Sequence, residues 1–300
     1  MSREEVPPDT RVLDGPRLLN PPPADGARTR RWKVARPLVV RLAAGIGIAV
    51  LALLVVLWLG EAGVYNLPFA LSILPSLLKG FTLTAEIIIV IVPLGFGLGL
   101  LVGWARTSPA AWVRGFAGVY VDFFRSMPPI VLIAFAYLIG LIGLQNEIAD
   151  PFLQHTIALW FGVVALGLHT SAYQAEIVRA GILSVPAGQT EAALAVGMSR
   201  LRSLFMVVLP QAFRVSLPAL GNEFSSVIKD SSLLSVIGWL ELSGIGLVQL
   251  YGALRIGLSG PLIVWIAIAI FYFLVTFALN STVRTVENAF KVPGLEAGQL

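Results

Sequence analysis

Several long stretches of this chain carry no charged residue, and this pattern restricts the possible fold more than any other feature. A helix needs about 20 residues to cross roughly 30 Å of hydrocarbon, because each residue adds about 1.5 Å. Five uncharged stretches have approximately this length: 42–60, 87–105, 127–144, 156–175 and 256–283. A sixth stretch, 215–240, is interrupted by charged residues: Glu223, Lys229 and Asp230. The sequence therefore predicts an all-α integral membrane protein with six transmembrane helices.

The composition agrees with a membrane protein and excludes several kinds of site. Of the 300 residues, 57% are hydrophobic and only 13% are charged, which lies outside the range of soluble domains. The absence of cysteine excludes disulfides and cysteine-ligated metals. With only two histidines, we expect no metal site.

Lysines and arginines are distributed unequally between the two sides that these helices define. Nine of them lie at or before Arg41, and further groups separate the second helix from the third and the fourth from the fifth. The loops of the opposite side contain only Lys79 and Arg255. Because cytoplasmic loops are enriched in lysine and arginine, we predict that both termini are cytoplasmic. The net charge of +4 then reflects membrane topology, and nucleic-acid binding is not expected.

The part of the chain before the second helix divides into three segments. Residues 1–36 are rich in Pro, Arg and Asp and are predicted to form a disordered cytoplasmic tail. Residues 37–60 are predicted to be a transmembrane helix, since the apolar run is too long for a cleaved signal. Residues 61–81 have the pattern of an amphipathic segment that lies at the outer interface.

The second predicted helix carries Gly95, Gly99 and Gly103 at four-residue spacing. Small residues on one face let another helix approach closely, which matters because lipid removes the hydrophobic drive between helices. We predict that this face packs tightly; the alternative is that glycine is simply common in membrane helices. The pair Pro128-Pro129 predicts a kink or local unwinding at the start of the third helix.

A comparatively polar, helix-prone segment separates the fourth and fifth helices. Residues 191–195 are good helix formers, Pro186 and Gly188 mark a preceding turn, and Gly197 is placed to end a helix of about two turns. A helix this short is unstable alone in water, so it needs a groove to occupy. We interpret it as a cytoplasmic docking element for a soluble partner. An ordinary loop is the alternative.

A second short helix is predicted to follow this element. Ser199 can cap a helix over 200–208, and Pro210 is expected to break it.

The same segment resembles the EAA loop of ABC importer permeases. Glu191-Ala192-Ala193 is followed after three residues by Gly197 and, further on, by Leu209-Pro210, while Val207 stands where isoleucine is commonest. The flanks are similar to the polar amino-acid uptake subfamily, the histidine/glutamine/arginine-type permeases, over 172–177, 179–182, 188–193, 209–212 and 229–233. Tyr120 with Arg125-Ser126-Met127-Pro128 resembles a further family element, in which Ser126 replaces the usual glycine. The resemblance covers about residues 76–290.

The resemblance implies a five-helix permease core with a cytoplasmic coupling helix, to which the 37–60 helix is an addition. The transmembrane domain would occupy 82–290, with the coupling loop at 184–210 and a cytoplasmic C-terminal tail at 291–300. The residues expected to couple to the ATPase are Gly188, Glu191, Ala192, Ala193, Gly197, Leu209 and Pro210.

The resemblance also implies partners. They are a second permease subunit (identical or not), two cytoplasmic ABC ATPase subunits, an extracytoplasmic solute-binding protein and a polar amino acid as substrate, all at the inner membrane of a prokaryote. The chain contains no glycine-rich loop ending in Gly-Lys-Ser/Thr. We therefore expect no catalytic residue and no cofactor in this chain, with ATP and Mg²⁺ bound by the partner ATPase.

Polar residues within the predicted spans are candidates for the substrate path, because ionisable groups are costly in hydrocarbon and by default functional. Glu176 and Arg179, three residues apart on one helical face, are expected to pair with each other instead. The candidates are Arg125, His169, Tyr173, Gln174, Asn222, Lys229, Asp230 and Ser232.

Each charged candidate also has a structural interpretation. Arg125 could bind a substrate carboxylate in a bidentate manner, or could anchor its helix at the headgroups. His169 could face the pore, although a packing role is favoured. For Lys229 and Asp230 we favour a structural ion pair, at a break in the fifth helix, over direct contact with substrate.

Two other classes of protein remain open on sequence grounds. An ion-coupled secondary carrier would need an acidic relay within the membrane but no docking helix. An intramembrane hydrolase would need a nucleophile and a base. Ser171 and His169 are two residues apart on a helix and point in different directions, which disfavours the hydrolase.

Overall fold

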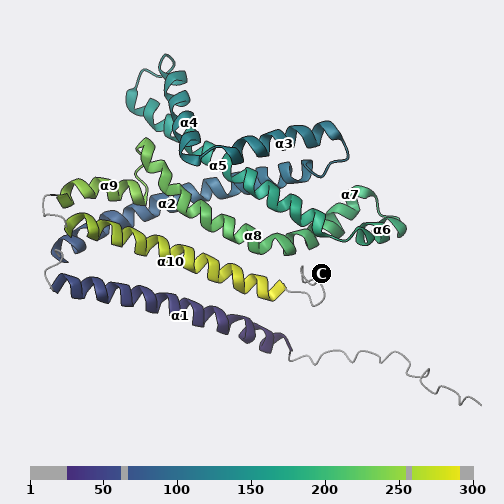
Figure 1. The fold of residues 1–300 in the computed structure, drawn as a ribbon, viewed down its shortest axis with the longest axis horizontal. Helices are drawn as coiled ribbons and strands as arrows, with labels where there is room; N and C mark the ends of the chain where they lie inside the picture. Colours follow the sequence, from purple (N-terminus) through teal and green to yellow (C-terminus); the bar gives the residue numbers. More distant parts are fainter. Residues whose placement is uncertain (1–25, 62–66, 255–258, 291–300) are drawn as a thin grey trace, which may run out of the picture.

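The computed structural model describes residues 26–61, 67–254 and 259–290. Within these ranges the chain forms helices and no strand (Figure 1). The α-helices are α1 (Gly26–Glu61), α2 (Leu67–Ala105), α3 (Ala111–Ser126), α4 (Pro129–Leu144), α5 (Pro151–Ser184), α6 (Ala187–Ala195), α7 (Arg200–Ser203), α8 (Leu209–Asp230), α9 (Leu242–Ala253) and α10 (Ser259–Phe290). A π-helical turn over Leu204–Val208 joins α7 to α8, and a 3₁₀ helix over Ser231–Ile237 follows α8.

Four helical segments of the described chain are long and apolar enough to cross a membrane, and α3 with α4 forms a fifth if the bent pair is one span. The four are Leu71–Ala105, Pro151–Ser184, Arg200–Ile237 and Pro261–Glu287. The predicted all-α membrane class is thus confirmed. Within α1, Val39–Val55 is a shorter apolar helix, so a sixth span stays a prediction.

The third predicted helix has a different form from the one expected. The sequence placed a helix over 127–144 after a basic loop, but the structure has two helices, α3 and α4, that are bent by 102°. Met127 is extended at φ −93° and ψ 135°, because the residue before a proline disfavours the helical region. The kink at Pro128-Pro129 is confirmed. Helix α3 is not predicted from the sequence, because its charged residues are typical of a loop between membrane spans.

The N-terminal part of the chain also departs from the predicted segments. Residues 67–81 are the first turns of α2 and do not form a separate interfacial segment. Ile73 and Leu77 in these turns are buried in a cluster with residues of α9 and α10, so their apolar face packs on the bundle. Helix α1 begins at Gly26, inside the predicted tail. The tail predictions for 1–25 and 291–300 lie outside the described residues.

Helices α2 and α5 approach each other closely along the glycine face predicted for α2. A Cβ atom added to Gly95 would lie 2.5 Å from Thr170 Oγ1, and one added to Gly103 would lie 2.6 Å from the carbonyl oxygen of Ala175. The predicted tight packing of this face is therefore confirmed. The pair forms the centre of the bundle, with α8 also packed against α5.

Helix α1 lies alongside α10 at the edge of the bundle (Figure 1). The contact is close because Gly45 faces the ring of Phe277, which a Cβ atom at position 45 would overlap. Many apolar side chains of α1 are exposed, among them Val39, Ile46 and Trp58. These side chains are suited to contact with lipid.

A buried carboxylate organises the end of the bundle opposite α6 and α7. Glu241 is completely buried and caps α9 by accepting hydrogen bonds from the backbone nitrogens of Ser243 (2.9 Å) and Gly244 (2.8 Å). Tyr272 of α10 donates its hydroxyl to the same carboxylate at 2.9 Å. Glu241 thus ties α9 to α10. Glutamate is not among the residues favoured as N-caps, so the sequence alone does not predict this role of Glu241.

Candidate functional site

The predicted docking element is a short helix with a well-defined end. Helix α6 ends at Ala195, and Gly197 adopts a left-handed conformation with φ +86°. The backbone nitrogens of Gly197 and Met198 donate to the carbonyls of Leu194 (3.0 Å) and Ala193 (3.1 Å), which closes the helix as expected for a glycine C-cap. The predicted two-turn helix and its termination at Gly197 are confirmed.

One face of α6 is packed and the other is free. Ala193 is buried, whereas Glu191, Ala192 and Val196 are exposed, Val196 to 75%. Gly188 has nothing within 4 Å of the position of a Cβ atom. The exposed surface combines glycine and alanine with one carboxylate and the apolar side chains of Leu194 and Val196, and it is open to another protein.

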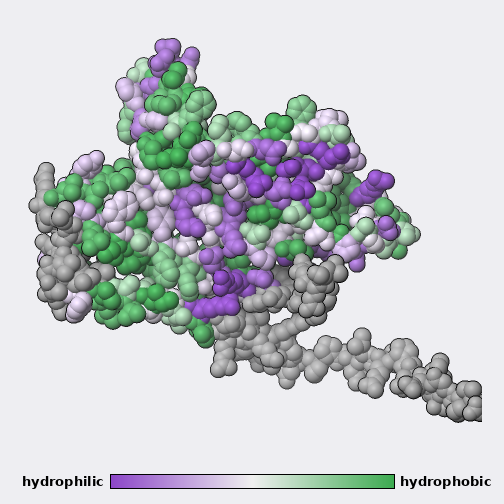
Figure 2. Space-filling model, viewed as in Figure 1, coloured by the Kyte–Doolittle hydropathy of each residue, from purple (hydrophilic) through white to green (hydrophobic). Residues whose placement is uncertain are grey.

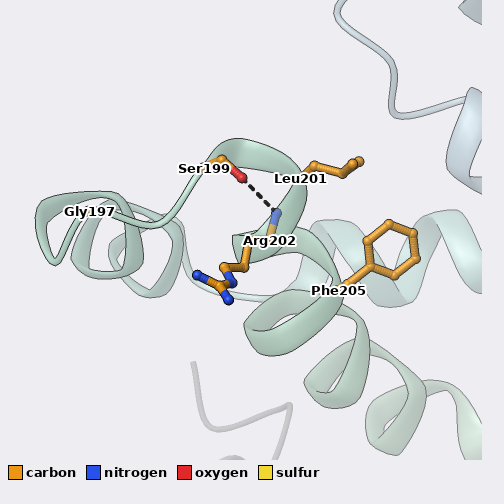
Figure 3. Close-up of a pocket in the computed structure, with 5 residues that line it drawn as sticks. All are labelled: Gly197, Ser199, Leu201, Arg202 and Phe205. Atoms are coloured by element: carbon orange, nitrogen blue, oxygen red, sulfur yellow. Dashed lines mark hydrogen bonds between the residues drawn. The ribbon is translucent and has the colours of Figure 1, made fainter.

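The segment after α6 leads directly into the bundle. Ser199 caps α7 by accepting a hydrogen bond from the backbone nitrogen of Arg202 at 3.3 Å, as predicted (Figure 3). The expected break at Pro210 is absent. The wide turn before α8 lets the nitrogen of Leu209 donate to the carbonyl of Leu204, so Pro210 sits in the first turn of α8, where a missing N–H costs little.

This continuity has a mechanical consequence. Residues Arg200–Ile237 form one helical segment that is long enough to cross a membrane. The segment starts beside α6 and continues into the core. Leu209 and Pro210, expected in the coupling loop, lie at the start of α8. A displacement of α6 can therefore be transmitted along a continuous helical path.

A concave surface adjoins the turn at Gly197. A pocket of about 420 Å³ is lined by Gly197, Ser199, Leu201, Arg202 and Phe205. In Figure 3 the Arg202 side chain points back towards the Gly197 turn, while Leu201 and Phe205 point away from it. The pocket beside the turn therefore combines a cation with apolar side chains.

The substrate-path candidates on α3 and α5 lie together. The guanidinium carbon of Arg125, at the end of α3, lies 5.1 Å from the ring centroid of Tyr173. The ring centroid of His169, also on α5, lies 5.1 Å from the ring centroid of Tyr173. A cation over an aromatic face is attracted to it, so Tyr173 helps to hold Arg125 in place.

His169 serves mainly to join two helices. Its side chain is buried, and Nδ1 donates a hydrogen bond of 2.9 Å to the carbonyl of Phe124 in α3. Tyr120 of α3 adds a second link, because its hydroxyl lies 2.7 Å from Ser171 Oγ. The favoured interpretation of His169 as a packing residue agrees with this geometry.

Acidic residues of α8 complete the cluster. Glu223 and Asp230 lie near enough for their charges to influence Arg125 and His169, but neither acid forms a salt bridge with a described residue. The favoured ion pair between Lys229 and Asp230 is not formed, since no salt bridge joins them within the described part of the chain. Helix α8 ends at Asp230 and continues as a 3₁₀ helix within the single segment Arg200–Ile237, so the helix type changes here but the expected break in the fifth helix is not present.

The remaining candidates occupy different surroundings. Asn222 is exposed and Ser232 is half-buried, on α8 and the 3₁₀ helix respectively. Gln174 is completely buried between α5 and the glycine face of α2, and its amide makes no hydrogen bond with the described residues. Gln174 therefore faces the interior of the protomer, away from the exposed cluster.

The predicted pair between Glu176 and Arg179 is confirmed and has a third member. Arg179 donates to Glu176 Oε1 through Nε at 2.9 Å and through Nη2 at 2.5 Å. Arg106, at the end of α2, donates to Oε2 of the same carboxylate at 2.6 Å. Sequence patterns do not predict this contact of Arg106, because Arg106 is far from Glu176 along the chain. This network joins α2 to α5 next to the coupling segment.

Polar residues gather on one face of the molecule. Figure 2 shows hydrophilic residues over α3, α5 and α8, whereas hydrophobic residues cover the regions of α4 and α9. Three polar side chains are exposed on segments that are long and apolar enough to cross a membrane, namely Arg125, Asn222 and Lys229. Because charged groups are costly in contact with hydrocarbon, this face needs a polar cavity or another subunit against it. Within the described residues no group of histidine and acidic side chains is arranged to hold a metal.

Comparison with known proteins places this geometry in context. Residues 95–292 match the protein family described as binding-protein-dependent transport system inner membrane component. The chain is 35% identical over 219 residues to the glutamine transport system permease protein GlnP of Escherichia coli strain K12, covering 73% of this chain and 94% of GlnP. It is 37% identical over 217 residues to the L-cystine transport system permease protein TcyB of Bacillus subtilis strain 168, covering 72% of this chain and 87% of TcyB.

A solved structure has the same fold. One chain in the crystal structure of an amino acid ABC transporter with histidines superposes with a TM-score of 0.63 and 30% sequence identity. The match covers 75% of this chain and 99% of that chain.

Proposed function

Because the chain belongs to the family of binding-protein-dependent inner-membrane transport components, we propose that it is the permease subunit of an ABC importer of amino acids. The observation that carries the proposal is the pairing of an exposed, capped α6 with a continuous helical path into a membrane bundle. The amino-acid cargo is supported by the names of relatives that transport glutamine and L-cystine. The chain is a transport subunit and not an enzyme.

The proposal includes the source of energy. A permease of this family works with a solute-binding protein and an ATPase, and we assign ATP and Mg²⁺ to that ATPase. We place its docking surface on Gly188, Glu191, Ala192, Ala193 and the turn at Gly197. All of these residues are exposed except Ala193, which is buried. On this assignment α6 and both chain termini are cytoplasmic, in agreement with the distribution of lysine and arginine.

The proposal also includes a second permease subunit. The exposed polar face over α3, α5 and α8 would face that subunit, so that the two together enclose a polar passage. Either a second copy or a related permease would meet this requirement. Binding of ATP would move α6, and the continuous 200–237 segment would convert this movement into a rearrangement of α8 against α5.

Reconstitution tests the source of energy. Vesicles that contain the chain, its ATPase and its binding protein should accumulate at least one of L-glutamine, L-cystine and L-arginine only when ATP is supplied. A catalytically inactive ATPase should abolish accumulation. Uptake that persists without the ATPase and follows an ion gradient would instead identify a secondary carrier.

A variant of Arg125 tests the substrate path. We expect R125Q to raise the KM for uptake by about tenfold or more, since a charge-assisted hydrogen bond contributes about 1.5–3 kcal/mol. R125K should recover part of the loss, because it restores the charge but not the planar guanidinium. If Arg125 only anchors α3, R125Q will reduce the amount of inserted protein while the KM of the remainder stays unchanged.

A further inference from the structure

A second cavity, larger than the pocket at Gly197, lies between the membrane bundle and the coupling segment. Its volume is about 770 Å³, within the range of pockets that hold small molecules. Leu101 and Trp104 at the end of α2 line one side, Leu183 at the end of α5 lines another, and Leu194 of α6 faces them. Neither the substrate path nor the exposed face of α6 uses this cavity.

The cavity lies at the level where a bilayer changes from hydrocarbon to headgroups. Two membrane-length segments, Leu71–Ala105 and Pro151–Ser184, end beside it, and Arg200–Ile237 begins there. Trp104 is 42% exposed and stands edge-on to Phe205 with ring centroids 6.3 Å apart. Tryptophan is enriched at membrane interfaces, so this position is consistent with the headgroup level.

The charges around the cavity favour an anionic occupant. None of its lining residues is acidic, and Arg200 is an exposed lining residue that makes no salt bridge with any described residue. Arg114 donates hydrogen bonds to the carbonyls of Ser108 (2.7 Å) and Pro109 (2.8 Å), which holds the α2–α3 turn at the rim. The cavity therefore combines apolar walls with a cation at its mouth.

We propose that this cavity binds one anionic phospholipid, with an acyl chain against Leu101 and Leu183 and the phosphate beside Arg200. Basic pockets between membrane helices on the cytoplasmic side are suited to such headgroups. A free anion would leave the apolar walls unfilled, and a zwitterionic lipid would gain less from Arg200. Because Leu194 and Thr190 belong to α6, the bound lipid touches both this helix and the bundle.

A fluorescent probe at the rim measures this binding. The chain contains no cysteine, so T107C provides a single site for a bimane label beside the cavity. The labelled full-length chain is placed in vesicles with dibrominated phosphatidylglycerol or phosphatidylcholine, whose bromines quench the probe on contact. We expect phosphatidylglycerol to bind about fivefold better, as one arginine near anionic lipid provides. A label at I142C, exposed on α4, should show no preference.

Paired substitutions locate the lipid. In the labelled T107C background, R200Q should remove the preference, whereas R202Q should retain it, because Arg202 lines the smaller pocket and not this one. V113W should narrow the cavity and reduce quenching by both lipids. V119W, at a position on α3 that is 69% exposed and outside the cavity, should leave quenching unchanged.

Several results would overturn the assignment. Equal quenching by the two lipids, or a preference that survives R200Q, would show that no headgroup is recognised. Displacement of the lipid by inorganic phosphate would identify a free anion as the ligand. Displacement by the partner ATPase would show that the cavity is part of a protein interface.

Discussion

Replacement of Gly103 with leucine should lower the melting temperature of the purified protein by roughly 5–10 °C. A Cβ atom at this position would lie 2.6 Å from the carbonyl oxygen of Ala175 and 2.8 Å from Val178 Cβ. Neither atom can move without displacing α5, and overpacking of this kind costs about 1–3 kcal/mol. The same displacement would separate Arg106 from Glu176, which adds to the loss.

Gly97 supplies the matched control, since it lies on α2 with nothing within 4 Å of its Cβ position. Both substitutions replace a glycine inside a helix by leucine. This replacement alone stabilises the helix by about 1 kcal/mol. G97L should therefore leave the melting temperature unchanged or slightly raised. The measurement is thermal unfolding in detergent, with size-exclusion chromatography used to determine how much folded protein remains after heating. Equal melting temperatures for G103L and G97L would show that the α2–α5 contact is looser than the structure indicates.

The features that could be predicted from sequence are those with a local cause. Gly197 ends α6 because glycine accepts a left-handed conformation, and that preference is visible in the sequence. Proline at positions 128 and 129 produces the bend between α3 and α4 for an equally local reason. Gly103 and its neighbours revealed a packing face through their spacing alone.

The features that sequence reasoning missed depend on partners distant in the chain. The charges of helix α3 are typical of a basic loop, so its sequence does not predict a helix. Its place in the bundle depends on contacts with α5, such as that of His169 with Phe124. In the sequence, Arg106 is typical of the cytoplasmic charges that orient a membrane protein. Its salt bridge with Glu176 depends on the fold. Pro210 was expected to end a helix, and only the wide turn before it allows the helix to continue.

Substitution of Gly197 by valine should reduce ATP-driven uptake by about tenfold or more, with little effect on membrane insertion. The residue has φ +86°, where an L-amino acid costs about 1–2 kcal/mol, and a β-branched side chain is the least tolerated. The strain would open the turn that closes α6, and the helix would lose the shape that we propose docks on the ATPase. The bundle should stay folded, because nothing lies within 4 Å of the Cβ position.

A second substitution at the same position separates backbone strain from side-chain bulk. Asparagine tolerates the left-handed region, so G197N should keep much of the uptake that G197V loses, although both introduce a side chain into the same open space. Uptake and ATPase activity are measured in the reconstituted transporter, and protein amount is measured in the membrane fraction. We expect G197V to retain ATP hydrolysis that no longer drives accumulation. Normal uptake by G197V would mean that the turn after α6 does not transmit the movement, and the coupling surface would then have to lie elsewhere.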